Sequence, residues 1–375
     1  MEENRVKNNT NQFVMDSASG ARIIIDGKEY SFFAGTSYFE LHKHEAVIKS
    51  ATDAIMRYGI TSASSRNSYG TTQLLLDLEI EAARFFDTED AVYIPSGYLS
   101  DLAAIPALNI TNPFDIILID EVAHYSNQHA IKLSGKPVYT FSHMDADDLQ
   151  NKLSANLKKN QTPLIITDGI FPISGEIAPI DLYEKIASRY NGIIWVDDAH
   201  AIGILGANGS GTIEHYGLNS ERIFFGGTFS KAFGAFGGII PASKKLVYEI
   251  KNNHILNGAT PAPSAAMAAS LTGMRLVKEN PQFRKSLWEN AKYLKKELKK
   301  MGIDTDDTVV PIVSWSLQNK DMMQKLHGEL MKKGIVIQYI NYMGSGDNGV
   351  LRIVVFSTHT KEHIQNLIYE LNRII

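Results

Sequence analysis

The stretch GGTFSKAFGAFGG, residues 226–238, carries one lysine between two short apolar runs, RIFF and IIPA. Lys231 is followed by Gly234, Gly237 and Gly238, and glycines let the backbone come close to a neighbouring group. Apolar runs of this length are typical of buried strands. We therefore expect Lys231 to lie at the end of a strand, with its amine directed into a cleft.

The same alternation of short apolar runs and helical patterns extends over residues 90–240. The runs are AVYIP, DIILID, PVYTF, PLIITD, GIIWVDDA, RIFFGGTF and GGIIPA, with helices such as 147–159 and 182–190 between them. Near-continuous apolar strands that alternate with helices are typical of a mainly parallel sheet covered on both faces. The sequence therefore predicts the α/β class, with a mainly parallel sheet flanked by helices in a large domain.

The pattern changes after an Ala-rich helix expected at 261–279. Three apolar runs, VVPIVSWSL, IVIQYI and LRIVVFS, and helices at 321–333 and 361–374 indicate a small α+β unit. The N-terminal run ARIIIDGKEYSFFAG alternates like a hairpin about Asp26-Gly27, and we expect it to pack beside that unit. We predict an N-terminal segment, a large α/β domain, and a linker helix with a small C-terminal α+β domain, at 1–50, 51–255 and 256–375.

Composition and charge exclude several classes of protein. The formal net charge of −4 over 375 residues excludes a strongly basic nucleic-acid binder. The absence of cysteine excludes disulfides, zinc thiolate sites and thiol nucleophiles, and it fits a reducing compartment. The N-terminal stretch MEENRVKNNTNQ lacks the apolar core of a signal peptide, and no run reaches the ~18–20 apolar residues of a membrane span. We expect a cytoplasmic protein with no membrane span and no metal site.

Polar residues follow four of the predicted strands at the points where the strands end. In an open α/β sheet, ligands bind beyond the carboxyl ends of the strands, so these positions form the candidate site. They are Ser96, Gly97 and Tyr98 after AVYIP, His124 after DIILID, Asp197 and His200 after GIIWV, and Thr228, Ser230 and Lys231 after RIFF. The combination of these residue types at four strand ends, more than any one of them, indicates a shared site.

The candidate residues suit pyridoxal phosphate. A carboxylate at the buried end of a strand, such as Asp197, needs a cation, and a protonated pyridine nitrogen supplies one and makes the ring an electron sink. His200 is placed to reach the phenolic oxygen, and Lys231 to form a Schiff base. Donors for a phosphate are offered by Thr228, Ser230 and the backbone N–H groups of Gly97-Tyr98.

At these residues the chain resembles the α-oxoamine synthases, a family of fold-type I pyridoxal-phosphate transferases. The resemblance runs from about Ile24 to Leu371 and is carried by SSRNSYGTTQLLLDLE at 64–79, IPSGYLSDLAAI at 94–105, TDGIFPISGEIAPI at 167–180, VDDAHAIGILGANGSG at 196–211, GGTFSKAFGAFGG at 226–238 and LRIVVFSTHT at 351–360. It implies an acyltransferase of the 8-amino-7-oxononanoate synthase type. Such an enzyme condenses an amino acid with an acyl-CoA thioester, with decarboxylation, to an α-amino ketone.

The resemblance also implies a role for each matching residue. For the cofactor these are Lys231 as the Schiff-base lysine, Asp197 on the pyridinium nitrogen, His200 on the phenolic oxygen, His124 stacked on the ring, and Thr228 with the Gly97-Tyr98 turn at the phosphate. Arg352 aligns with the arginine that holds the substrate carboxylate, a task that suits a guanidinium fork. The segment NGATPAP at 257–263 resembles a stretch that reaches the phosphate of the neighbouring subunit, which implies a homodimer with shared active sites.

Several positions depart from the family pattern. Where the family usually has Asn-Asp-Tyr-Leu-Gly-Leu, this chain has TSYFEL, so that Thr36 replaces the asparagine near the amino-acid carboxylate. Pro172 replaces a common cofactor-facing serine, and Leu75 a frequent histidine. These departures leave the amino acid and the acyl donor open. They also leave two other hypotheses: an aminotransferase, aldolase or lyase of the same fold, and a non-catalytic scaffold.

Overall fold

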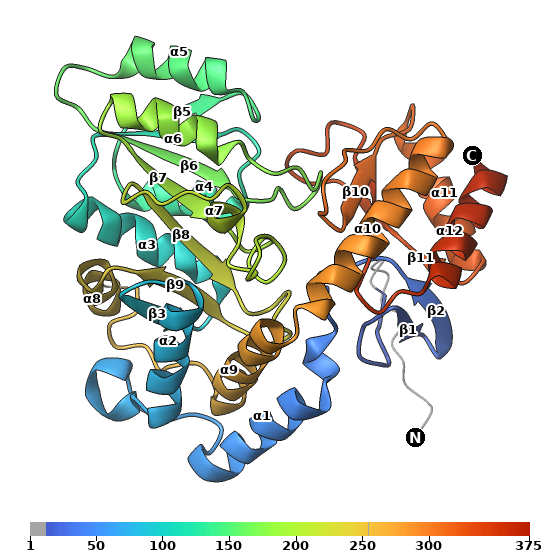
Figure 1. Ribbon diagram of the computed structural model, residues 1–375, viewed down its shortest axis with the longest axis horizontal. Coiled ribbons are helices and arrows are strands. Elements are labelled where there is room, and N and C mark those ends of the chain that lie inside the picture. The colour runs from blue at the N-terminus through green and yellow to red at the C-terminus, as the bar shows by residue number, and fades with distance from the viewer. Residues whose placement is uncertain (1–12, 254) are drawn as a thin grey trace.

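The computed structural model describes residues 13–253 and 255–375, which form two lobes (Figure 1). One lobe holds a seven-stranded sheet, and the other holds two three-stranded sheets. The long helix α10 (Gln282–Lys300) leads from the first lobe into the second. The stretch MEENRVKNNTNQ, for which the sequence predicted no signal peptide, lies outside the described residues.

The large sheet has the strand order β3-β9-β8-β7-β6-β4-β5. Its strands are β3 (Asp90–Ile94), β9 (Gly238–Ala242), β8 (Ile223–Thr228), β7 (Ile193–Asp197), β6 (Pro163–Asp168), β4 (Ile116–Asp120) and β5 (Val138–Phe141). Strands β4 to β8 run parallel, whereas β9 runs antiparallel to both β8 and β3. The predicted mainly parallel sheet is confirmed.

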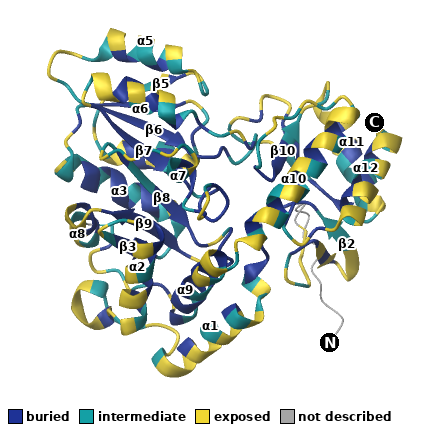
Figure 2. Cartoon of the chain, viewed as in Figure 1, coloured by how far each residue is buried: buried dark blue, intermediate teal, exposed yellow. Residues whose placement is uncertain are grey.

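Alternate residues of the central strands enter cores on opposite faces of this sheet. Ile193 and Trp195 of β7 pack on one face, beneath α3 (Gly97–Thr111) and α8 (Lys244–Asn252). Ile194 and Val196 pack on the other face, beneath α5 (Ala146–Asn156), α6 (Ile180–Arg189) and α7 (Thr212–His215). Figure 2 shows the strands buried between these helices, and burial on both faces explains why the strands are apolar along their whole length.

The strand register brings the carboxyl ends of three strands close together. Asp168 at the end of β6 is paired with Asp197 at the end of β7, and Asp197 is paired with Gly226 of β8. Because parallel strands have their carboxyl ends at the same edge, the loops after β6, β7 and β8 open onto one place.

The second lobe combines the two ends of the chain. β1 (Arg22–Ile25) and β2 (Lys28–Phe32) form the predicted hairpin, and both turn residues have positive φ, 48° at Asp26 and 73° at Gly27. β2 pairs in parallel with β11 (Ile335–Val336), so the hairpin packs beside the C-terminal unit as expected. The other sheet has the order β10-β13-β12, with β10 (Ile312–Trp315), β13 (Val350–Val354) and β12 (Gln338–Ile340). The run IVIQYI therefore supplies two strands, in different sheets.

Most predicted helices lie within a few residues of their expected limits. α11 (Lys320–Lys332) and α12 (Lys361–Ile374) close the second lobe, whereas α9 (Ser264–Glu279) packs with α1 (Glu45–Tyr58) and α2 (Gln73–Phe85) against the first. α9 begins at Ser264 rather than at residue 261, because Pro263 disfavours the helical conformation at Ala262, the residue before it. Among the described residues, no helix has both the length and the apolarity to cross a membrane. The domain limits at 50 and 255 stay a prediction.

Candidate active site

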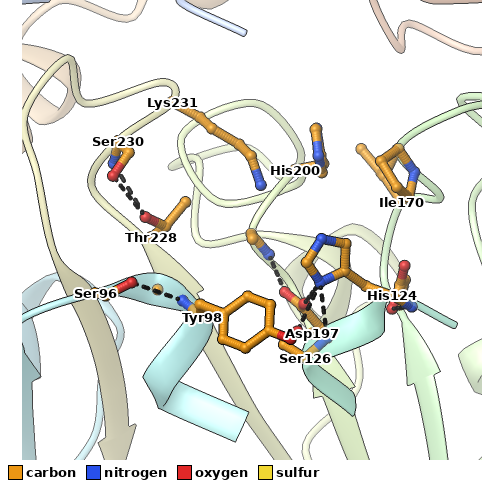
Figure 3. A pocket seen from close by; sticks show the side chains of 14 residues that line it. Ser96, Tyr98, His124, Ser126, Ile170, Asp197, His200, Thr228, Ser230 and Lys231 are labelled. Carbon is orange, nitrogen blue, oxygen red and sulfur yellow. Dashed lines mark hydrogen bonds and ion pairs between the residues drawn. The ribbon is translucent and has the colours of Figure 1, made fainter. Parts of the chain in front are cut away.

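A cavity of about 210 Å³ lies at the carboxyl ends of β6, β7 and β8. All of the predicted cofactor residues line it: Ser96, Gly97, Tyr98, His124, Asp197, His200, Thr228, Ser230 and Lys231. Pro172, one of the departures from the family pattern, lines it as well. Figure 3 shows the amine of Lys231 between His200 and Thr228, with Asp197 and His124 on the floor below. Two predicted substrate residues, Thr36 and Arg352, do not line this cavity.

The N-terminus of α3 and the end of β8 form one wall of the cavity. Ser96 caps the helix, and its hydroxyl accepts a hydrogen bond from the Tyr98 N–H at 3.2 Å. A Cβ atom at Gly97 would lie 2.7 Å from the Thr228 side chain, so only glycine fits there. The Thr228 hydroxyl donates to the Gly237 carbonyl at 2.8 Å and accepts from the Ser230 N–H at 3.1 Å. The hydrogen of the Thr228 hydroxyl is thus already bonded to Gly237, and the donors that the wall offers to an anion such as phosphate are backbone N–H groups at the start of α3 and the Ser230 hydroxyl.

Asp197 and His124 form the floor. Asp197 accepts a hydrogen bond from the Ala199 N–H at 3.1 Å, and its other oxygen lies 4.0 Å from the His124 Nδ1. His124 caps α4 (Tyr125–Ala130), and its Nδ1 lies 2.6 Å from the Ser126 hydroxyl. Burial lowers the pKa of His124, although the Asp197 carboxylate opposes that shift. His124 is therefore held as a neutral ring at neutral pH.

The neighbouring carboxylate, Asp198, lies on the other face of the sheet. Its side chain is fully buried and accepts hydrogen bonds from both the backbone N–H and the hydroxyl of Thr212. A Cβ atom at Gly169 or at Gly211 would lie 1.9 Å from this carboxylate, so both positions require glycine. Burial raises the pKa of Asp198 to about 7. Because successive side chains along a strand point to opposite faces, Asp197 points into the cavity and Asp198 points into the core.

Lys231 carries the amine of the cavity. That amine makes no hydrogen bond and no ion pair with any other described residue, although the side chain is half-buried. Burial lowers the pKa of Lys231, while the carboxylates of Asp197 and Asp168 act in the opposite direction. A lower pKa raises the fraction of neutral amine, which is the nucleophilic form.

His200 is bonded to a residue to which the sequence assigned no role. The His200 Nδ1 lies 2.7 Å from the hydroxyl of Tyr38, and both side chains are buried. Burial holds the pKa of His200 well below its ordinary value, and the charges of Lys231 and Arg352 act in the same direction. The only sequence signal for Tyr38 was its place in the segment TSYFEL.

Two buried carboxylates were also missed: Asp168 lines the cavity, and Asp101 does not. Asp168 accepts hydrogen bonds from the His124 N–H and the Asn127 amide, each at 3.2 Å. Asp101 of α3 accepts from the Trp195 indole N–H at 2.9 Å. Burial and the Asp197 carboxylate raise the pKa of both groups well above their ordinary range. Asp168 ends the run PLIITD, so it could have been found as Asp197 was, as a polar residue at the end of a predicted strand. No sequence pattern pointed to Asp101.

Arg352 lies in β13 of the second lobe, and its side chain is buried. Among the described residues, it donates one hydrogen bond, to the Gln338 side chain at 2.6 Å, and its Nε has no partner. Its charge acts on Lys231, His200 and Tyr38. A buried guanidinium with an unpaired N–H is suited to bind an anion between the lobes. Leu75, another departure, is buried in the hydrophobic core and does not line the cavity.

His143 links the end of β4 to the loop after β6 by two ion pairs. The His143 Nδ1 lies 3.0 Å from the buried Asp120 carboxylate, and its Nε2 lies 3.2 Å from Glu176, in the loop that carries Pro172. Burial alone lowers the pKa of His143, but the hydrogen bonds to Asp120 and Glu176 outweigh it and raise the pKa to about 9.

The pKa of His143 predicts a change in stability with pH. The charged ring contributes up to about 3 kcal/mol, fully present below pH ~6.5 and lost as the pH rises through about 9. Denaturant unfolding of the wild type and of His143→Gln at pH 6 to 10 measures this contribution. We expect the difference between their free energies of unfolding to shrink as the pH rises, and a constant difference would contradict the assignment.

Known proteins resemble this chain over nearly its whole length. The sequence matches the aminotransferase class I and II family over residues 34–371. 8-Amino-7-oxononanoate synthase of Thermosipho melanesiensis is 34% identical over 352 residues, which cover 93% of this chain and 89% of that one. Serine palmitoyltransferase of Sphingobacterium spiritivorum is 30% identical over 363 residues, or 96% of this chain and 90% of that one.

The fold is shared with a solved structure as well. Serine palmitoyltransferase from S. paucimobilis, with a bound PLP–myriocin aldimine, superposes with a TM-score of 0.90 at 23% identity, over 97% of this chain and 92% of that one. The chain therefore belongs to the aminotransferase class I and II family, in its α-oxoamine synthase group.

Proposed function

We propose that this protein condenses an amino acid with an acyl-CoA thioester, with loss of carbon dioxide, to give an α-amino ketone. The observation that carries the proposal is the convergence of Lys231, Asp197 and His200 on one cavity. Relatives named 8-amino-7-oxononanoate synthase and serine palmitoyltransferase support this reaction over transamination or lyase chemistry.

The cavity fits pyridoxal phosphate by the chemistry of its donors. The Lys231 amine has no partner among the described residues, and the N-terminus of α3 at Gly97 offers backbone N–H groups to a phosphate. When bound, this cofactor withdraws electrons from the α-carbon of an amino acid. Lys231 would hold it covalently, and Asp197 would keep a proton on its ring nitrogen.

Residues of the cavity would transfer the proton of the substrate and hold the cofactor ring and phosphate. We assign to Lys231 the removal of the α-proton of the amino acid, since its lowered pKa suits an amine that takes and returns a proton. His124, on the floor of the cavity, would pack on the face of the ring, and His200 would bind the ring's phenolic oxygen. The Ser96, Tyr98 and Ser230 positions complete the phosphate wall.

The reaction is tested by release of carbon dioxide. The purified holoenzyme is incubated with amino acids and a series of acyl-CoA thioesters, and labelled carbon dioxide and free coenzyme A are measured together. The proposal predicts equal amounts of both. Conversion of an amino acid without a thioester, leaving the amine on the cofactor, would indicate an aminotransferase instead. No turnover, together with full biological activity of a Lys231→Ala variant, would indicate a scaffold.

Arg352 is expected to bind the carboxylate of the amino acid, with Thr36 near it. Arg352→Lys keeps the charge but loses the planar fork, so we expect the KM for the amino acid to rise ~10- to 100-fold, with a smaller change in kcat. Steady-state kinetics with the amino acid and the thioester varied separately measures both constants. Arg189→Lys, at an exposed arginine of α6, is the matched control. An unchanged KM for the amino acid in Arg352→Lys would contradict the assignment of Arg352 to the substrate site.

We also propose a cytoplasmic homodimer with shared active sites. Three apolar side chains on or near α1 and in the loop before α2 are strongly exposed, at 83% for Met56, 61% for Ile60 and 92% for Tyr69. The segment 257–263 lies beside that loop, since its Ala259 carbonyl accepts the Arg66 N–H at 3.2 Å. A second copy is the occupant that we propose for this surface. Sedimentation equilibrium tests it, and a fully active monomer would contradict it.

A further inference from the structure

We propose that Tyr38 is a positioning residue that fixes the ring tautomer of His200, with the proton on Nε2, so that His200 presents a hydrogen-bond donor to the cavity. The effect of this tautomer on catalysis rests on the proposed function, whereas the assignment of the tautomer does not depend on that function. The two residues lie 162 positions apart in the sequence and meet at 2.7 Å.

The direction of this hydrogen bond follows from burial. Tyr38 is 0% exposed, and its hydroxyl has no partner other than the His200 Nδ1 among the described residues. If the His200 Nδ1 carried the proton, the hydrogen of the Tyr38 hydroxyl would be buried without an acceptor, which is costly. The Tyr38 hydroxyl therefore donates, and the His200 Nδ1 accepts.

The surrounding charges keep both partners in the forms that this bond requires. Burial, and then the cations Lys231 and Arg352, lower the pKa of His200 and so oppose a charged imidazole. Burial raises the pKa of Tyr38 well above its usual range, and the Arg352 charge offsets only part of that shift. A neutral imidazole whose Nδ1 accepts must carry its hydrogen on Nε2.

The segment that carries Tyr38 is held in place by hydrogen bonds and an ion pair. The Tyr38 carbonyl accepts the Ser357 N–H at 2.9 Å. Two residues later, the buried Glu40 has a positive φ of 56° and is bound by Lys43, Thr358 and the Ala21 N–H. These bonds tie the segment that carries Tyr38 to the chain that follows β13, the strand of Arg352.

The consequence for the cavity is chemical selectivity. His200 lines the cavity, and because its Nδ1 is bonded to Tyr38, Nε2 is the ring nitrogen left for a bound molecule. An N–H group there favours an oxygen acceptor, such as the phenolate oxygen of the cofactor. The opposite tautomer would present a lone pair and repel that oxygen. Tyr38 thus acts on the cofactor through His200, without contact of its own.

The test reads the tautomer directly. Holoenzyme labelled with ¹⁵N-histidine is examined without substrate by long-range ¹H–¹⁵N correlation, and the His200 signals are identified by their loss in His200→Gln. We expect a protonated Nε2 and a bare Nδ1 in the wild type. In Tyr38→Phe we expect a mixture of tautomers, a higher pH midpoint for the visible absorption band, and a roughly tenfold lower kcat.

Tyr183→Phe is the matched control. Tyr183 is also fully buried, but its hydroxyl has no hydrogen-bond partner in the part of the chain that the structure describes, and its α6 helix packs on the far face of the sheet from α3. We expect wild-type His200 signals, absorption and kcat in that variant. A protonated Nδ1 in the wild type, or unchanged His200 signals in Tyr38→Phe, would overturn the inference.

Failure of this inference is distinguishable from failure of the proposed function. The tautomer is measured without substrate, so it does not depend on which reaction the enzyme carries out. If carbon dioxide is released as proposed and the His200 tautomer is wrong, only the role of Tyr38 is lost. Thermal unfolding of Tyr38→Phe checks that its fold is intact, and a spectral change in a fully folded variant supports the positioning role.

Discussion

Replacing Lys231 with alanine is expected to lower turnover by at least ~10³-fold, because the variant loses both the covalent attachment of the cofactor and the base for the α-proton. The amine is surrounded by the cavity and has no partner among the described residues, so its removal leaves no buried carboxylate without a hydrogen bond. We therefore expect the midpoint of thermal unfolding to stay near that of the wild type.

Two measurements check this expectation for Lys231. The visible spectrum of the variant, reconstituted with pyridoxal phosphate, should resemble that of the free cofactor, and borohydride reduction should leave no added mass on the chain. Lys244→Ala, at an exposed lysine in the first turn of α8, is the control and should behave as the wild type. Cofactor retained covalently in Lys231→Ala would place the attachment on another residue.

The fold was predictable where burial dominates the sequence. Runs such as IILID and IIWVD have apolar residues on both faces of the strand, as strands in a sheet covered on both sides do. The hairpin was predictable because Asp26-Gly27 is a favoured two-residue turn. The antiparallel direction of β9 was not predictable, because a short run such as GIIPA reads the same in either direction. The split of IVIQYI between two sheets depends equally on partner strands that are distant in the sequence.

The site residues that lie at or just after the end of a predicted strand could be predicted from the sequence. Asp197, His200 and Lys231 were found in this way, and the cavity brings them together. Tyr38 was given no role, because its contact with His200 joins residues 162 positions apart and leaves no periodic pattern in the sequence. Asp101 was missed for a related reason: it lies within a helix, and only the tertiary structure shows that it bonds Trp195 and not solvent.

The second large effect is expected for Asp197→Asn. An amide cannot balance a protonated ring nitrogen, so the cofactor becomes a weaker electron sink, and we expect kcat to fall ~10²- to 10³-fold. The amide oxygen can still accept from the Ala199 N–H, which bonds Asp197 at 3.1 Å, so we expect little change in the free energy of unfolding. Single-turnover kinetics and denaturant unfolding measure the two quantities.

Asp198→Asn is the matched control for that prediction, because the chain places two adjacent aspartates on opposite faces of β7. Asp198 does not line the cavity, and within the described part of the chain its carboxylate is hydrogen-bonded to Thr212 alone. We expect this variant to lose ~1 kcal/mol of stability and to keep its kcat. We therefore expect Asp197→Asn to lower kcat with little change in the free energy of unfolding, and Asp198→Asn to lower the free energy of unfolding with little change in kcat. If Asp197→Asn unfolds the protein, or if Asp198→Asn lowers kcat as much, then Asp197 is a structural carboxylate, and the electron-sink role belongs elsewhere.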